Sequence, residues 1–442
     1  SLEQFDEFVA RAHDLGLKVV IDIVPNHSSS DHPWFRSALE GRDSPHRDHY
    51  VWRDPAPDGG PPNNWIAIFG GPAWTFDEAS GQYYMHLFLP EQPDLNWASP
   101  AVHREFEQVF EFWMDRGVDG FRIDVAHSLC EDQSFADNPP KPGIGREPVD
   151  FADLIHDHDI DQPETIEVYR SWRRLVADRD VLLVGEVYVD PAPEMDKYVD
   201  DALDLTFFFG LNPIDWDPAT YVTTLRDAVE SLPDGWGWVQ GSHDEHRAVT
   251  RFGGGSEGVE RSLALWVALF GLPGMPFLFQ GEELGLENGV VAPEHVLDPV
   301  GKRSPEDGRD PCRTPMPWEP GAGPGFSSGE PWLISETRPD TDVASVQAQD
   351  PDSPLSRTRA LLQARRATSG GRIGHVEWIE APDGVAAYRR SGVAHVANLT
   401  DEPVRVALRG ESRLVHSTGD AVVVGDLVEL APRTGAILEM DT

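Results

Sequence analysis

The stretch Gly117-Val-Asp-Gly-Phe-Arg-Ile-Asp124 decides the fold class of this 442-residue chain. Its apolar residues predict a strand over 118–125, and that strand follows a helix whose apolar residues recur at helical spacing, namely Val102, Phe106, Val109, Phe110 and Trp113. A helix followed by a largely apolar strand is the repeating unit of a parallel α/β sheet. The stretch therefore predicts a parallel sheet covered by helices.

The same unit recurs along the chain. Residues 1–16 predict a helix that Ser1 caps and Gly16 ends, and a nearly continuous apolar run follows at 17–24. Such a run is typical of a strand that is buried on both faces. Two further apolar stripes, beginning at Ile166 and Leu263, also precede strand candidates. In all we predict six strands, near 17–24, 118–125, 181–187, 203–209, 238–242 and 276–280.

Two other segments have a different character. Residues 28–100 are rich in Pro, Gly, Trp and Asp and are too long for an ordinary loop, which predicts a small inserted domain. Residues 371–442 contain short alternating runs, which predict a C-terminal antiparallel β domain. The predicted catalytic barrel then comprises residues 1–27 and 101–370.

Composition narrows the choice of partners. The formal net charge of −40 repels phosphate backbones, so nucleic acid and anionic membranes are excluded as partners, whereas a neutral substrate is compatible with it. No apolar run approaches the roughly 20 residues that span a bilayer. The first residues lack the features of a signal peptide, and two cysteines are too few for a disulfide framework, so we expect a cytoplasmic protein with free thiols.

Charged residues stand at the ends of the predicted strands. They are Asp22, Arg122 with Asp124, Glu186, and His243 with Asp244. In a β/α barrel the carboxyl ends of the strands meet at one rim, where the active site lies. We therefore expect these side chains to share one pocket.

Several carboxylates without a Ser/His/Asp elbow or a phosphate-binding loop favour glycosidic chemistry. One carboxylate would act as the nucleophile and another as the general acid. The residues alone do not assign these two roles. Metal-dependent, phosphatase-like chemistry would also use several Asp and His, and it is the alternative at this point.

Taken in order, these segments resemble the conserved regions of the α-amylase superfamily, glycoside hydrolase family 13. The matching segments are Asp22-Ile-Val-Pro-Asn-His27, Gly120-Phe-Arg-Ile-Asp-Val125, Gly185-Glu186-Val187 and His243-Asp244. Two more, Gln92-Pro-Asp-Leu-Asn-Trp97 and Gly308-Arg-Asp-Pro-Cys-Arg-Thr-Pro-Met-Pro-Trp318, are similar to the α-glucosidase and oligo-1,6-glucosidase branch. The resemblance implies a (β/α)8 barrel with an inserted domain and a C-terminal β domain.

The resemblance also implies the role of each site residue. Asp124 matches the nucleophile, Glu186 the general acid/base, and Asp244 the third carboxylate, which holds sugar hydroxyls. The residues implied to bind substrate are Asp22, His27, Phe88, Arg122, His243 and Arg309, with Arg313 as a further candidate. No organic cofactor and no metal are expected. The run His156-Asp-His-Asp159 could suggest a metal cluster, but it offers no closed set of ligands.

The sequence departs from the family pattern at two places. Ser242 stands where the family usually has Asn. In addition, the strand at 17–24 matches the family's third strand, so we expect the first two strands and their loops to be missing from this chain. A barrel without them exposes sheet edges. We therefore expect this chain alone to fold poorly and to have little activity.

The implied function is retaining, exo-acting hydrolysis of terminal α-linked glucose from short, maltose-like oligosaccharides, with α-1,4 links favoured weakly over α-1,6. One alternative is a glucosyl-transferring relative of the trehalose synthase or sucrose isomerase type. Another is a non-catalytic ancillary relative, which would have lost its catalytic carboxylates. The sequence does not indicate the oligomeric state.

Overall fold

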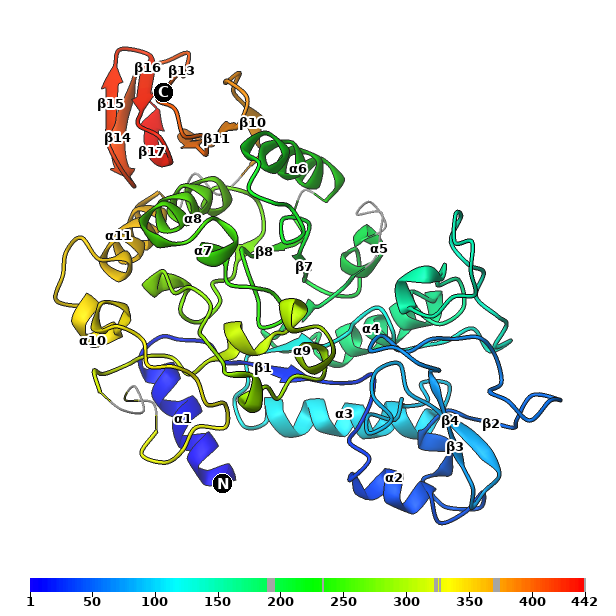
Figure 1. The fold of residues 1–442 in the computed structure, drawn as a ribbon. Helices are drawn as coiled ribbons and strands as arrows, with labels where there is room; N and C mark the ends of the chain where they lie inside the picture. Colours follow the sequence, from blue (N-terminus) through cyan, green and yellow to red (C-terminus); the bar gives the residue numbers. More distant parts are fainter. Residues whose placement is uncertain (189–194, 233, 322–324, 326, 369–373, 441–442) are drawn as a thin grey trace. The chain divides into compact units, whose positions relative to one another are not determined.

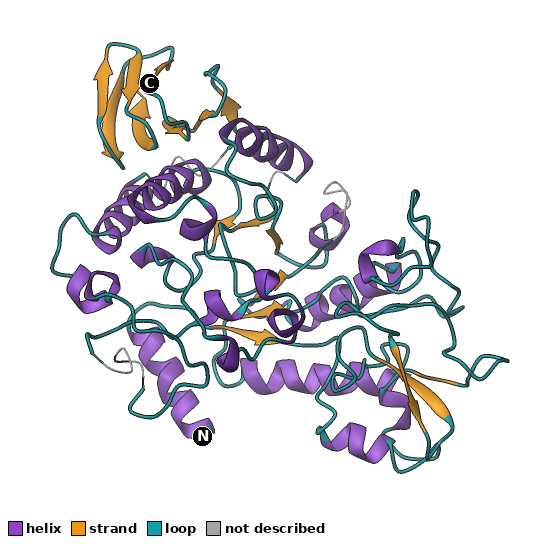
Figure 2. Cartoon of the chain, viewed as in Figure 1, coloured by secondary structure: helices purple, strands orange, loops and turns teal. Residues whose placement is uncertain are grey.

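The computed structural model describes residues 1–188, 195–232, 234–321, 325, 327–368 and 374–440. The chain forms two compact units, residues 1–207 and residues 208–442. Each unit contains helices and strands of its own, as Figures 1 and 2 show.

A parallel sheet lies at the centre of the first unit. Strands β1 (Val20–Ile23), β5 (Gly120–Ile123), β6 (Leu182–Gly185) and β7 (Leu205–Phe208) follow one another in that order, and each pair is parallel. Asp22 pairs with Arg122, and Ile123 pairs with Gly185. This register brings the polar residues at the carboxyl ends of the strands to the same edge of the sheet.

The helices of the first unit confirm the predicted periodicity. They are α1 (Leu2–Asp14), α2 (Pro33–Ala38), α3 (Pro100–Met114), α4 (Pro163–Leu175) and α5 (Asp196–Val199). Ser1 caps α1 in a capping box with Gln4. The α3 side chain Phe110 packs on Phe121 of β5, with ring centroids 4.4 Å apart. The apolar stripe of α3 therefore covers the sheet, as Figure 1 also indicates.

The burial predicted for the first strand is wrong. Val20 and Val24 are each 40% exposed, and of the β1 residues only Ile23 is buried. The physical reason is that β1 stands at the end of the strand order, so it has one partner strand, β5, among the described residues. The central strand β5, in contrast, buries Gly120, Phe121 and Ile123.

Residues 28–100 contain a small antiparallel sheet in the order β2-β4-β3. Its strands are β2 (Trp52–Arg53), β3 (Trp74–Asp77) and β4 (Gln82–Met85). Beside it lies a buried cluster formed by Val51, Trp65, Ala67, Ala73, Trp74 and Met85. Trp52 and Trp97 are buried as well, so four of the five tryptophans in this segment are core residues.

The second unit contains two short parallel strands, β8 (Trp236–Trp238) and β9 (Met275–Pro276). The predictions at 238–242 and 276–280 are wrong in extent, because each overlaps its strand by one residue only. Pro276 itself has no N–H to donate, and the next residue, Phe277, donates its N–H to the Trp238 carbonyl at 2.8 Å. Most of the other residues predicted as strand at 239–242 and 278–280 are loop. The helices of this unit are α6 (Pro218–Ser231), α7 (Ala248–Arg251), α8 (Gly255–Phe270), α9 (Pro299–Arg303), α10 (Ala344–Gln347) and α11 (Pro354–Ala367).

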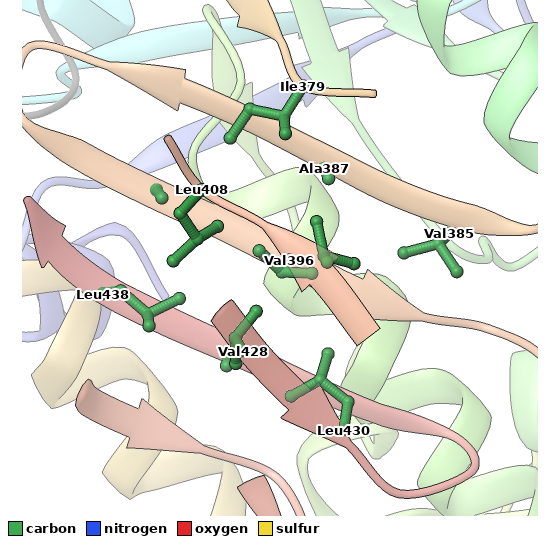
Figure 3. Close-up of a cluster of buried hydrophobic side chains, with 11 residues drawn as sticks. Ile379, Val385, Ala387, Val396, Leu408, Val428, Leu430 and Leu438 are labelled. Atoms are coloured by element: carbon green, nitrogen blue, oxygen red, sulfur yellow. The ribbon is translucent and has the colours of Figure 1, made fainter. Parts of the chain in front are cut away.

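The end of the chain forms two antiparallel sheets, which confirms the predicted β character. One has the order β10-β11-β12-β17-β14 and the other the order β13-β16-β15. Apolar side chains from both sheets, including Val396, Leu438 and Val428, form one core (Figure 3). The strands are β10 (Glu377–Trp378), β11 (Val385–Arg390), β12 (Val393–Asn398), β13 (Val404–Ala407), β14 (Ser412–Ser417), β15 (Ala421–Val424), β16 (Leu427–Leu430) and β17 (Thr434–Met440).

A buried histidine joins the larger of these sheets to α8. His395 of β12 stacks on Tyr388 and places its Nδ1 2.9 Å from the carbonyl oxygen of Val267. Burial lowers the pKa of His395 from 6.5 to about 4, although the Val267 contact opposes this shift. The folded protein therefore holds His395 neutral at a pH where the unfolded chain protonates it.

This histidine predicts acid-sensitive stability. Between about pH 6.5 and pH 4 the unfolded state binds a proton that the folded state does not, so the free energy of unfolding decreases as pH falls, by about 1.4 kcal/mol per pH unit. Between pH 7 and pH 5 the free energy of unfolding, measured by urea denaturation, should therefore fall by about 2 kcal/mol less in His395→Gln than in the unsubstituted protein. His375→Gln, at an exposed position, is the control. Equal pH dependence in all three proteins would contradict the prediction.

Candidate active site

One arginine of the first unit contacts three carboxylates. Arg122 Nη1 donates to Asp124 Oδ1 at 2.5 Å and to Asp22 Oδ1 at 2.9 Å. Arg122 Nη2 lies 2.9 Å from Glu186 Oε2. Asp22, Arg122, Asp124 and Glu186 come from or directly follow three neighbouring strands, as the positions of the strand ends predict.

The electrostatics of this cluster follow from burial and opposite charge. Burial alone would lower the pKa of Arg122, but the negative charges of Glu186, Asp124 and Asp22 outweigh burial and raise it above its usual range. The Glu186 side chain is 7% exposed and that of Asp124 is 20% exposed, whereas that of Asp22 is 53% exposed. The permanent positive charge therefore lies against two carboxylates that are largely shielded from water.

The backbone continues the sheet pattern beyond the strand ends. The Asp124 N–H donates to the carbonyl of Ile23, and the Glu186 N–H donates to the carbonyl of Ile123, each at 2.9 Å. A Cβ added at Gly185 would lie 2.5 Å from Leu203 Cδ1, so any larger residue would force the buried Leu203 side chain to shift. Hydrogen bonds to the neighbouring strands thus fix the backbone positions of Asp124 and Glu186.

His27 and Phe88 lie together, with ring centroids 5.1 Å apart. Gln92 Nε2 donates to His27 Nε2 at 2.8 Å. Burial lowers the pKa of His27 to about 4, against the opposing effect of the Asp124 charge. His27 is therefore a neutral ring at neutral pH, and its electrostatic coupling to Asp124 places it near the Arg122 cluster. The contact made by Gln92 was missed by sequence reasoning, although the motif containing it was recognised.

The second unit gathers its own predicted site residues around Asp244. Its Oδ1 accepts hydrogen bonds from Arg309 Nη1 at 3.0 Å and from Arg313 Nη2 at 2.7 Å. His243 Nε2 lies 3.2 Å from Asp244 Oδ2. Arg313, the less certain of the two predicted arginines, therefore contacts Asp244 as directly as Arg309 does.

A further residue, Asp298, was missed by sequence reasoning. It holds Arg309 through contacts of 2.7 Å to Nη2 and 3.1 Å to Nε, and its side chain is completely buried. Burial alone would raise the pKa of Asp298, but hydrogen bonds from the side chain and N–H of Arg309 lower it to about 2. The only local signal is its position before Pro299, which is typical of a helix cap and not of a site residue.

Removing this carboxylate should destabilise the protein. In Asp298→Asn the half-buried Arg309 loses a charged partner whose side chain is completely buried, and we expect the free energy of unfolding to fall by roughly 3 kcal/mol. Asp401→Asn is the matched control, because Asp401 also pairs with two arginines, Arg261 and Arg433, but its side chain is 58% exposed. Asp401→Asn should lower the free energy of unfolding by less than about 1 kcal/mol. Chemical denaturation that gives equal losses for both variants would contradict the prediction.

The two cysteines and the two histidines of the 156–159 run are shielded or paired. Cys130 and Cys312 are buried and free, and burial raises the pKa of their thiols to about 12 and about 11. His156 and His158 pair with Asp159 and Asp132, at 2.9 and 2.7 Å. Across the described parts of the chain, no group of three or more His, Cys, Asp or Glu is arranged to hold a metal ion.

Parallel strands with carboxylates at their ends, followed by C-terminal antiparallel sheets, are compatible with a barrel-type glycoside hydrolase. The family model described as "Alpha amylase, catalytic domain" matches residues 1–370. The chain therefore belongs to the alpha-amylase family.

Relatives and solved structures agree with this assignment. The chain is 36% identical over 427 residues to a probable alpha-glucosidase of Rhizobium meliloti (strain 1021), covering 91% of this chain and 77% of the relative. It is 34% identical over 413 residues to an oligo-1,6-glucosidase of Heyndrickxia coagulans, covering 83% and 72%. The crystal structure of the alpha-glucosyl transfer enzyme XgtA matches all of this chain and 86% of its own, with a TM-score of 0.91 and 34% identity.

These matches confirm the fold class, a (β/α)8-type barrel with a C-terminal β domain, and they confirm that the chain is an enzyme of the glycoside hydrolase class. The non-catalytic alternative is therefore not supported. Within the described residues, no helix is both long enough and apolar enough to cross a bilayer. The cytoplasmic location stays a prediction.

Proposed function

We propose that the protein is a retaining, exo-acting α-glucosidase in which Asp124 is the nucleophile and Glu186 is the general acid/base. The observation that supports this best is the shared guanidinium of Arg122, which contacts Asp124 Oδ1 through one nitrogen and Glu186 Oε2 through the other. Retaining enzymes hold their two carboxyl groups about 5–5.5 Å apart. Asp124 and Glu186 contact the two Nη atoms of the same guanidinium, and this arrangement is compatible with that spacing.

In the first step Asp124 attacks the anomeric carbon while protonated Glu186 donates its proton to the leaving oxygen. This forms a covalent glucosyl ester on Asp124 and releases the rest of the sugar. In the second step ionised Glu186 takes a proton from water, and the resulting hydroxide oxygen displaces Asp124. Both displacements invert the anomeric carbon, so the product keeps the α configuration.

The surrounding residues would bind the glucose that is cleaved off. His27, neutral at neutral pH, can donate or accept a hydrogen bond to a hydroxyl, and Phe88 beside it offers an apolar ring face to the sugar. Arg122 would orient Asp124, and Asp22 would share the guanidinium.

The proposal also assigns roles to the residues of the second unit. Asp244 would hold sugar hydroxyls, and His243 beside it would bind sugar as well. Arg309 and Arg313 orient the Asp244 carboxylate through the contacts described above. These assignments rest on the resemblance of His243-Asp244 and of the 308–318 segment to the family motifs.

The proposed substrate is a short oligosaccharide with a terminal α-linked glucose. We favour α-1,4 links, because Val125-Ala-His-Ser-Leu129 is similar to the maltose-type α-glucosidases. A residue of the Val125 type is also associated with α-1,6 cleavage in part of the family. One relative named above is an oligo-1,6-glucosidase, so maltose and isomaltose should be compared directly.

Glucosyl transfer is the second candidate function. It uses the same covalent intermediate but passes the glucose to a sugar hydroxyl in place of water. The observation that favours glucosyl transfer as a candidate function is the likeness to XgtA, which is an alpha-glucosyl transfer enzyme.

The test uses protein expressed from its complete reading frame and incubated with maltose, isomaltose or sucrose. Chromatography that finds free monosaccharides only supports hydrolysis, whereas new disaccharides or trisaccharides support transfer. Proton NMR of the first product should show α-glucose before mutarotation. Initial release of β-glucose, or no turnover of any α-glucoside, would contradict the proposed function.

A further inference from the structure

Two cavities of the second unit have Met316 as a common lining residue. One is also lined by His243 and Arg313, which belong to the proposed site. The other has a volume of about 310 Å³, and none of the residues assigned above to the reaction line it. That volume lies at the lower end of the range of ligand pockets, roughly 300–1,000 Å³. We call this second cavity the Trp318 pocket.

The Trp318 pocket has an apolar base, and the backbone around it is held in place. The large apolar side chains of this base belong to one buried cluster, and they are Leu284, Met316 and Leu355. At the start of α10 the Ala344 N–H donates to the Pro317 carbonyl at 2.9 Å. The next N–H, that of Ser345, donates to the Trp318 carbonyl at 3.1 Å. The pocket is therefore formed before a ligand arrives, and binding needs little ordering of the chain.

Aromatic and charged groups also line the pocket. Trp318 is 46% exposed, and the charged residues that line the pocket with it are Glu283, Glu319 and Arg359. Within the part of the chain that the structure describes, the indole N–H of Trp318, the carboxylate of Glu319 and the guanidinium of Arg359 make no hydrogen bond or ion pair. Glu283 Oε2 accepts a hydrogen bond from the Gly281 N–H at 2.8 Å. The ring and two of the charged groups are therefore available to a ligand.

This combination of groups fits a neutral sugar better than it fits other small ligands. A pyranose ring presents C–H groups on its faces, which pack on an indole, and hydroxyls at its edge, which exchange hydrogen bonds with carboxylates and guanidinium. Two carboxylates against one guanidinium give the pocket a negative balance, which disfavours a phosphorylated sugar or another anion. A purely apolar ligand would take these charged groups out of water without offering them hydrogen bonds.

We propose that the Trp318 pocket is a second sugar-binding site, separate from the catalytic carboxylates, that takes a glucosyl unit of a neutral α-linked oligosaccharide. The indole of Trp318 packs on the sugar ring, and Glu319 and Arg359 hydrogen-bond its hydroxyls. The choice of an α-linked glucosyl unit rests on the proposed function, whose residues line the neighbouring cavity. Because one glucosyl unit has few atoms, the expected Kd is on the order of 1 mM.

Fluorine-19 NMR measures binding at Trp318 directly. The protein, expressed from its complete reading frame, contains 5-fluorotryptophan and carries Asp124→Asn so that the sugar is not consumed. Trp318→Phe identifies the signal of Trp318. Trp332→Phe identifies that of Trp332, which is 59% exposed and lines the cavity of His243 and Arg313. Titration with maltotriose should move the Trp318 signal with a Kd on the order of 1 mM.

A substitution within the pocket separates local binding from binding in the neighbouring cavity. Glu319→Gln should weaken maltotriose binding at Trp318 about tenfold, because a hydrogen bond to a charged group becomes one to a neutral amide. The binding curve of the Trp332 signal should not change. Glu294→Gln makes the same substitution at another exposed position, outside the pocket, and is the matched control. It should leave both curves unchanged.

The outcomes distinguish this inference from the proposed function. A Trp318 signal that maltotriose does not move, or equal Trp318 curves in Glu319→Gln and Glu294→Gln, would overturn the sugar site even if the protein hydrolyses maltose. In protein that retains Asp124, Glu319→Gln should keep kcat for maltose within about twofold, and a larger loss would overturn the separation from the catalytic carboxylates. If the unsubstituted protein turns over no α-glucoside while the Trp318 curves behave as expected, the proposed function fails and the second sugar site is supported.

Discussion

Replacing Asp124 with Asn is expected to lower kcat for maltose by at least about 10⁴-fold while leaving the protein folded. An amide of the same shape cannot attack the anomeric carbon to form the glucosyl ester. Its oxygen can still accept the hydrogen bond from Arg122 Nη1, which lies 2.5 Å from Asp124 Oδ1. Steady-state kinetics together with urea denaturation measure the two effects separately.

Asp22→Asn is the matched control for this substitution. Asp22 is also a carboxylate on Arg122 Nη1, but its side chain is 53% exposed. We expect kcat/KM of the Asp22→Asn variant for maltose to fall less than about 100-fold, mostly because substrate binds more weakly. Residual turnover by Asp124→Asn within tenfold of the unsubstituted protein, or equal losses in both variants, would contradict the assignment of Asp124 as nucleophile.

Replacing Glu186 with Gln should have the second largest effect, and the size of that effect should depend on the leaving group. With maltose the first step needs a proton on the departing oxygen, so we expect kcat/KM to fall about 10³-fold. With α-glucosyl fluoride, whose leaving group needs little protonation, kcat/KM should fall less than about tenfold. The alkaline limb of the pH profile should disappear in the same variant.

The second step supplies a separate check on Glu186. Glutamine cannot take a proton from water, so release of glucose from Asp124 should become slow. Azide attacks without losing a proton, and it should restore turnover of α-glucosyl fluoride and yield α-glucosyl azide. If maltose and the fluoride are slowed equally, and azide restores nothing, Glu186 is not the acid/base.

Much of the fold was predictable, because buried helices and strands impose strict spacing on apolar residues. The stripe from Val102 to Trp113 indicates α3 for this reason. Strand extent was less predictable, because apolar residues continue past the last ladder bond. Leu278 and Phe279 lie beyond the Phe277 N–H, which donates to the Trp238 carbonyl, although their composition is typical of a strand.

The candidate site was predictable where a charged side chain directly follows a strand. Asp124 and Glu186 belong to this class, and Arg122 brings them together as expected. The residues that contact the site residues from other parts of the chain were not predictable. Asp298 lies 11 residues before its partner Arg309 in a loop, and the N–H of Val125, which donates to Glu186 Oε2 at 3.1 Å, belongs to a residue with φ +45°, a conformation that valine rarely adopts. Neither residue type carries a local pattern for these roles.

The two buried thiols have a practical consequence for spectroscopy. Only the thiolate reacts with maleimides and similar labels, and with pKa values of about 12 and about 11 Cys130 and Cys312 stay protonated at neutral pH. A single cysteine introduced on the surface, for example at the exposed position of Ser327, can therefore carry a fluorophore or spin label while both natural cysteines remain in place.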